Sequence, residues 1–208
     1  MIVGKRAANK RVRRKLTEGT VAQAQILDAA EELFYLEGAR NVGIDAVVKR
    51  AGMNKMSLYR QFESKEDLLK QYLQRRDEKF WSYLDASTAK HPNDARKQLR
   101  QLFIDLAKRA SALDYRGCPF VNIAVEFPDR AHFARQMVAD NKARLLKRLG
   151  ELAKVAGASN TTILAKSLAL LIEGAYAASQ TYGASNTVLA ALPKAAEILL
   201  DAAIESDN

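Results

Sequence analysis

Apolar residues recur along this chain at intervals of three and four positions, the spacing that places side chains on one face of an α-helix. The first such pattern is flanked by Thr20 and Gln23, which have the spacing of a capping box, and by Gly38, a typical residue after a helix C-terminus. We therefore predict a helix that begins near Thr20 and ends at Gly38. Its apolar face consists of Ile26, Ala29, Ala30, Leu33 and Phe34.

Two short helices and the beginning of a longer one are predicted next. A helix over residues 44–51 is followed by Gly52, which permits a tight turn. Asn54 can cap the following helix, and Ser64 with Asp67 forms a second cap-and-acid pair before another helix. Two short helices joined by a glycine turn are typical of a helix-turn-helix.

The remainder of the chain continues as amphipathic helices. We expect the fourth helix to end near His91, and further helices over residues 93–112 and 131–155 with a short apolar helix after Pro119 between them. Two apolar helices follow. Strand-like alternation of apolar and polar residues is not found. The pattern predicts an all-α fold with about nine helices.

The formal net charge of the 208-residue chain is +9, and it is unevenly distributed. Residues 1–20 contain seven basic residues and one acidic residue, a net charge of +6. A short segment with so high a net charge cannot fold alone, so we expect a flexible basic arm over residues 1–19. This arm is either a solvated tail or a DNA-tracking segment that uses residues such as Arg13 and Arg14.

Other features of the composition restrict the class of protein. No apolar run approaches the ~18 residues that a membrane span requires, and the N-terminus does not have the apolar segment of a secretory signal. We therefore expect a cytoplasmic protein without a membrane partner. Cys118 is the single cysteine, and His91 and His132 belong to no metal-binding or catalytic motif. We expect no metal, no cofactor and no enzymatic activity.

Four blocks of residues 26–69 resemble, in order and spacing, the tetracycline-repressor (TetR) family of bacterial transcriptional regulators. They are "ILDAAEELF", Gly38, "AGMNKMSLYRQF" and "SKEDLL". The resemblance implies a helix-turn-helix domain over residues 20–66 and an α-helical ligand-binding and dimerisation domain over residues 67–208. It also implies a homodimeric repressor that binds a palindromic operator in double-stranded DNA and is released by a small-molecule inducer. The alternative is an architectural or interaction protein with this fold and no inducer.

The resemblance places most DNA contacts on the third helix. Arginine can pair with guanine, glutamine with adenine, and methionine can contact a thymine methyl group, which suits Arg60, Gln61 and Met56. Tyr59 and Lys65 match positions that hold the DNA backbone. The expected DNA-contacting residues are Gly43, Asn54, Lys55, Met56, Ser57, Tyr59, Arg60, Gln61 and Lys65, together with Arg13 and Arg14 of the arm.

Two residues depart from the family pattern. Gly43 stands where the family usually has Ser or Thr near the start of the second helix, so a side-chain cap and a phosphate contact are lost. Met56 is bulky where the family usually has a small residue or proline. We expect the fold to tolerate both changes and the operator sequence to be affected.

The two C-terminal helices carry apolar stripes with four-three spacing. These stripes either close the core of one chain or form a dimer interface. Because the segment is apolar on more than one face and the family pairs these helices, we expect a homodimer, with Pro193 kinking the last helix or delaying its start. The expected interface residues are Leu164, Leu168, Leu171, Ala175, Ala178, Tyr182, Leu192, Ala195 and Leu199.

Large side chains spread over the middle helices predict a ligand pocket. Met and aromatic residues suit an adaptable apolar ligand, and because Glu126 would disfavour an anion, we expect an uncharged or cationic hydrophobic molecule. Cys118 is either a redox switch or inert packing. The expected pocket residues are Trp81, Phe103, Cys118, Phe120, Asn122, Glu126, Phe133, Met137, Tyr176 and Gln180.

Overall fold

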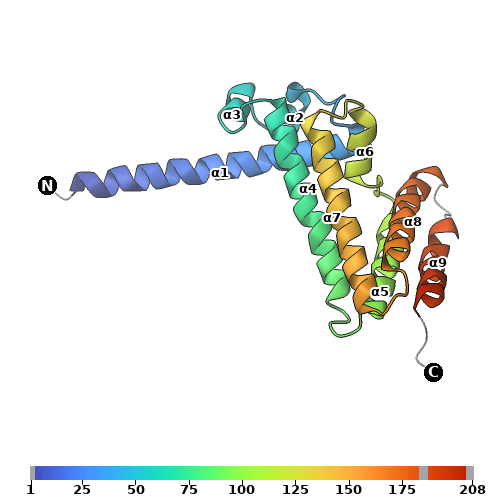
Figure 1. The fold of residues 1–208 in the computed structure, drawn as a ribbon. Helices are drawn as coiled ribbons and strands as arrows, with labels where there is room; N and C mark the ends of the chain where they lie inside the picture. Colours follow the sequence, from blue (N-terminus) through green and yellow to red (C-terminus); the bar gives the residue numbers. More distant parts are fainter. Residues whose placement is uncertain (1–2, 183–186, 205–208) are drawn as a thin grey trace. The chain divides into compact units, whose positions relative to one another are not determined.

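The computed structural model describes residues 3–182 and 187–204, and in these ranges it contains nine α-helices and no β-strand (Figure 1). The predicted all-α fold is therefore confirmed. The chain divides into two compact units, Met1–Arg75 and Arg76–Asn208. This boundary lies within a helix, beyond the division at residue 66 that the sequence suggested.

The first unit contains α1 (Val3–Glu37), α2 (Ile44–Arg50), α3 (Lys55–Tyr59) and the first part of α4 (Lys65–Thr88). α1 packs against both α2 and α3. The rings of Phe34 and Tyr72 meet edge to face, with centroids 5.5 Å apart. The other core side chains include Ile26, Ala30, Val47, Leu58, Phe62 and Leu68.

α1 begins at Val3, far before the predicted start near Thr20. The helix passes through Thr20, so the capping box predicted from Thr20 and Gln23 is wrong. The backbone of residues 3–19, expected to form a flexible arm, is helical as well. These residues are rich in good helix formers and contain no proline, and a helix that is already nucleated extends with one hydrogen bond per added residue.

The predicted caps of α3 and α4 are confirmed. Asn54 accepts a hydrogen bond at Oδ1 from the backbone N–H of Ser57, at 2.9 Å. The backbone N–H of Asp67 donates to Ser64 Oγ at 3.1 Å, and the Asp67 carboxylate accepts in return from the backbone N–H of Glu63. These bonds satisfy amide groups that have no partner inside their helix, and so fix where α3 and α4 begin.

The second unit contains the rest of α4 and five further helices. These are α5 (Ala95–Ala110), α6 (Pro119–Glu126), α7 (Phe133–Val155), α8 (Thr161–Thr181) and α9 (Thr187–Ala203). α8 packs against α7 and α9, and α9 also packs against α5. Leu99, Phe103, Leu149, Leu168 and Ala196 lie fully buried in this unit.

The ends of these helices differ from the predictions by only a few residues. α4 ends at Thr88 rather than near His91, and α9 continues through Pro193. The last turn of α9 is fixed by Ser159, whose backbone N–H and hydroxyl both donate to the carbonyl oxygen of Ala203, at 2.9 and 3.2 Å.

Candidate nucleic-acid interface and ligand pocket

α3 has one buried face and one exposed face. Leu58 and Phe62 are almost completely buried, and they anchor this short helix in the first unit. On the other side, the side chains of Met56 and Tyr59 are 65% and 52% exposed. Large apolar and aromatic groups held on a surface by a rigid support are able to contact a partner molecule. The other exposed residues here are Asn54, Lys55 and Arg60.

α3 ends earlier than the predicted contact residues extend. Tyr59 is its last residue, Arg60 is its C-cap, and Gln61 lies beyond it. Arg60 remains exposed, but Gln61 is half-buried and faces α1, since a Cβ placed on Gly19 would lie 3.8 Å from Gln61 Nε2. Arg60 is therefore better placed than Gln61 to contact a base edge.

The two lysines among the expected DNA contacts are held in position within the first unit. Lys55 Nζ lies 2.9 Å from Asp45 Oδ1, and this hydrogen bond raises the pKa of Lys55. Lys65 Nζ donates to the carbonyl oxygen of Arg40 at 3.2 Å. Because Lys55 and Asp45 are both exposed and their attraction is screened by water, a DNA phosphate can compete for the ammonium group.

The structure supports the weak cap expected at the start of α2. Gly43 is the N-cap residue and makes no side-chain hydrogen bond. Its φ of −86° is open to all residue types, and a Cβ at this position would meet no atom within 4 Å. A serine or threonine would therefore fit. The backbone of Arg13 and Arg14 lies in α1, and their side chains lie outside the described part of the structure.

The residues expected to line a ligand pocket are mostly buried in the core or engaged in hydrogen bonds. Phe103, Cys118, Phe120 and Tyr176 are buried in the core of the second unit. The indole N–H of Trp81 donates to Asp77, 3.2 Å away. Phe133, Met137 and Glu126 are half-buried.

Two further residues of the expected ligand pocket hold a loop in place through hydrogen bonds. The side-chain amides of Asn122 and Gln180 donate to the carbonyl oxygens of Arg116 and Tyr115, at 3.0 and 2.9 Å. Gly117, next in the loop, has a φ of +76°, in the region that favours glycine. These polar groups therefore position backbone rather than facing an open cavity.

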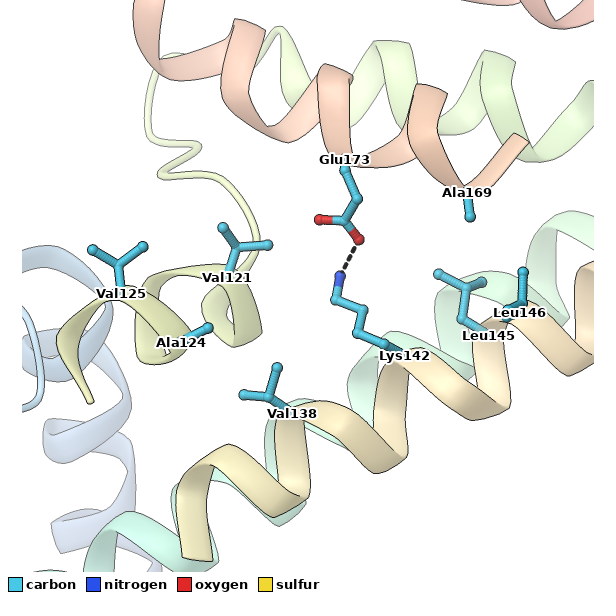
Figure 2. Close-up of a pocket in the computed structure, with 9 residues that line it drawn as sticks. All are labelled: Val121, Ala124, Val125, Val138, Lys142, Leu145, Leu146, Ala169 and Glu173. Atoms are coloured by element: carbon cyan, nitrogen blue, oxygen red, sulfur yellow. Dashed lines mark hydrogen bonds and ion pairs between the residues drawn. The ribbon is translucent and has the colours of Figure 1, made fainter. Parts of the chain in front are cut away.

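A cavity of about 470 Å³ lies elsewhere in the second unit, between α6, α7 and α8 (Figure 2). Seven of its nine lining residues have aliphatic side chains, and the other two, Lys142 and Glu173, form an ion pair of 2.5 Å. Its volume lies within the ~300–1,000 Å³ typical of small-molecule sites. The aliphatic lining residues are Val121, Ala124, Val125, Val138, Leu145, Leu146 and Ala169.

None of the ten expected pocket residues lines this cavity. The expected residues are mostly large, and large side chains fill space, whereas valines and alanines leave room beside the backbone. A signal for the cavity was nevertheless present. Lys142 occupies the same face of its helix as the apolar residues Val138 and Leu145, and Glu173 is the only acidic residue of α8.

Lys142 also approaches the single cysteine. Its Nζ lies 3.9 Å from Cys118 Sγ and 5.2 Å from the centre of the Tyr176 ring. Burial raises the pKa of the Cys118 thiol, although the charge of Lys142 opposes this, and burial also raises the pKa of Tyr176 well above its usual value. Both groups are therefore neutral near pH 7.

Cys118 is expected to react slowly with alkylating reagents. A raised pKa leaves less thiolate at a given pH, and thiolate is the reactive form. At pH 8 we expect iodoacetamide to modify Cys118 in the native protein at least about tenfold more slowly than in urea-unfolded protein, with rates measured by mass spectrometry. Equal rates would instead favour the redox-switch interpretation.

Most of the expected dimer-interface residues lie in the core of a single chain. Leu164, Leu168, Ala175, Ala178 and Leu192 are buried. The other members of the set, Leu171, Ala195, Leu199 and Tyr182, are half-buried or exposed.

Other apolar residues of α8 and α9 are exposed. Ile163, Leu170, Val188 and Ile198, which we call the outer stripe, are 59%, 73%, 43% and 56% exposed. α8 is also the one described helix long and apolar enough to span a membrane on length and composition alone, a property shared by core helices of globular proteins. α8 packs against α7 and α9, and seven of its residues are buried.

Each of the two histidines contacts a polar group of the fold. His132 caps α7 by accepting at Nδ1 from the backbone N–H of Ala134, and His91 Nε2 lies 3.4 Å from Gln101 Oε1. In the described residues, no group of three His, Cys, Asp or Glu side chains could hold a metal ion.

Residues 26–72 match the protein family described as bacterial regulatory proteins, tetR family. An uncharacterized HTH-type transcriptional regulator from Mycobacterium tuberculosis is 40% identical over 55 residues, which are 26% of this chain and 27% of that protein. The solved structure of a TetR-family transcriptional regulator from Streptomyces coelicolor has a TM-score of 0.84 at 29% identity, with 88% of this chain and 96% of that chain covered. A solved regulator of the same type from Streptomyces avermitilis has a TM-score of 0.75 at 32% identity, with 88% and 97% covered.

Proposed function

The chain belongs to the TetR family of bacterial transcriptional regulators, and from this premise we propose that it is a homodimeric repressor in the cytoplasm. We propose that it binds a palindromic operator in double-stranded DNA and is released by a small, largely hydrophobic ligand. Membership of a family of transcriptional regulators supports the expectation that the protein is not an enzyme.

The observation that carries the DNA-binding proposal is the exposed face of α3. A recognition helix needs side chains that reach the major groove and a support that prevents them from moving. Met56, Tyr59 and Arg60 are exposed, while Leu58 and Phe62 are buried beneath them. Arg60 is proposed to read a base, and Tyr59 with Lys65 to hold the phosphate backbone.

The outer stripe supports the proposed dimer. Single apolar side chains are common on protein surfaces, but several exposed apolar side chains on two helices that pack together are typical of an interface. In a two-fold dimer the same stripe contacts its own copy. Two DNA-binding units related by that axis would select an inverted repeat.

The cavity in the second unit supports release by a ligand rather than the inducer-free alternative. A fully packed unit would offer a small molecule no site, whereas about 470 Å³ with a mostly aliphatic lining accommodates one. To release the operator, the ligand must bind the form that does not bind DNA more tightly than the form that does.

Titration with two DNA fragments tests the proposal. The operator is first selected from random or genomic DNA, and binding is then compared between the full inverted repeat and a single half-site. We expect at least about tenfold tighter binding to the full repeat, since two half-sites are engaged at once. Affinity should also fall steeply between 50 and 200 mM salt, because DNA-bound counterions are released on binding. Equal affinity for both fragments would refute the proposal that the protein binds DNA as a dimer.

A further inference from the structure

We propose that the cavity between α6, α7 and α8 binds a monoanionic amphiphile, an apolar molecule with a single carboxylate, and that this carboxylate pairs with Lys142. The proposal rests on the ligand-release function proposed above and names the chemical class of the ligand. It differs from the uncharged or cationic molecule that the sequence suggested.

The lining of the cavity requires a ligand that is mainly apolar. Aliphatic side chains surround the ion pair: Figure 2 shows the valines of α6 and α7 on one side of it, and the two leucines of α7 with the alanine of α8 on the other. An apolar body placed here would be removed from water, with a gain of about 25 cal/mol for each Å² buried. One charged group on the ligand would then meet Lys142 and Glu173.

Lys142 is the better anchored member of the ion pair. Its ammonium group contacts the carboxylate of Glu173, the sulfur of Cys118 and the face of the Tyr176 ring. The second and third partners are neutral and remain in place if Glu173 moves away. Its side chain is 25% exposed, compared with 38% for Glu173.

Glu173 is the member that can be displaced at lower cost. Its contact with Lys142 is the one hydrogen bond or ion pair that the described part of the structure gives it. A carboxylate that is more than a third exposed regains water when it turns outward, so its loss from the pair is partly compensated. An incoming carboxylate can therefore take its place on Lys142.

A cationic ligand faces the opposite situation. To pair with Glu173 it would have to displace Lys142, which would break the contacts with the ring and the thiol as well as the ion pair. If Lys142 stayed, two cations would share one carboxylate, and the like charges would repel each other. The reason for expecting a cation also disappears, because Glu126 does not line the cavity.

Three probes of equal chain length test the proposal. Decanoate, decan-1-ol and decyltrimethylammonium are titrated at pH 8 into the protein of residues 1–208 by calorimetry, below the concentrations at which they form micelles. We expect decanoate to bind at least about tenfold more tightly than either of the others, the factor that corresponds to a charge-assisted hydrogen bond. Equal affinities of decanoate and decan-1-ol would overturn the proposal.

Variants of the ion pair identify the site. Lys142→Met should abolish the preference for decanoate, while Glu173→Gln should increase decanoate affinity because the competing carboxylate is removed. A merely structural ion pair predicts no increase in Glu173→Gln. Lys147→Met, which removes an exposed lysine of α7 outside the cavity, should bind all three probes as the parent does. If Lys142→Met does not fold, an unchanged decanoate affinity in Glu173→Gln suffices to reject the proposal.

Operator release is measured separately, so that the two proposals can fail independently. Decanoate that binds through Lys142 without releasing the operator would leave this site assignment intact and refute ligand release at this site. Release of the operator by decan-1-ol or decyltrimethylammonium, undiminished in Lys142→Met, would support ligand release and refute the carboxylate site.

Discussion

Phe62→Ala is expected to lower the free energy of unfolding by about 3–5 kcal/mol and to abolish operator binding. The Phe62 side chain is 1% exposed and lies just after α3, so its removal leaves a cavity beneath the residues proposed to contact DNA. Urea denaturation followed by circular dichroism measures the stability, and an operator titration measures the binding.

Tyr59→Ala is the matched control for this variant. Tyr59 is also aromatic and lies three residues earlier, but its side chain is 52% exposed. Its removal should change stability by no more than about 0.5 kcal/mol, and it should still weaken operator binding because a proposed phosphate contact is lost. Similar destabilisation by both variants would contradict the assignment of a buried and an exposed face to this segment.

Leu170→Asp is expected to shift the protein from dimer to monomer while each chain remains folded. Leu170 is 73% exposed in the single chain and lies in the outer stripe. In a two-fold dimer the substitution occurs twice and places unpaired carboxylates in an apolar interface. We expect the dimer dissociation constant to rise at least ~30-fold, the change expected for loss of an interface hot spot. Analytical ultracentrifugation measures the dimer fraction.

Two controls separate the outer stripe from the core. Leu168→Ala removes a fully buried side chain, so it should destabilise the fold by about 2–5 kcal/mol. Leu113→Asp replaces a leucine that is exposed outside α8 and α9, and it should leave both stability and dimerisation unchanged. Dissociation by Leu113→Asp, or an unchanged dimer in Leu170→Asp, would show that the outer stripe is not the interface.

Local signals predicted the helices of the first unit well where a specific side chain ends or begins a helix. Asn54 and Ser64 cap α3 and α4 as expected, and Gly38 follows α1 with a φ of +90°. Such signals act over three or four residues, so they are readable without knowledge of the tertiary fold.

The start of α1 was not predictable in the same way. The charge of residues 1–20 suggests that the segment cannot fold alone, but this segment continues from a helix that is already packed. Extension of an existing helix does not require the unfavourable nucleation step. Residues 3–19 therefore extend an existing helix rather than folding as an isolated segment.

The proposed interface and the cavity of the second unit depend on tertiary packing. Leu168 and Leu170 are both leucines of one apolar helix, yet one is buried and the other exposed. The neighbouring helices determine which apolar stripe faces the core. The sequence of a helix that is apolar on several faces does not show which of them is buried. The cavity is similar, because it arises where small side chains of α6, α7 and α8 meet.

The hydrogen bonds from Ser159 to Ala203 determine the end from which the last helix frays. Helix ends normally open first, because their terminal carbonyl groups have no partner within the helix. At the C-terminal end of α9, Ala203 accepts two hydrogen bonds from the turn before α8, whereas nearer its N-terminal end Pro193 has no N–H to donate to the preceding turn. Amide hydrogen exchange in α9 should therefore be faster before Pro193 than in the turn that ends at Ala203.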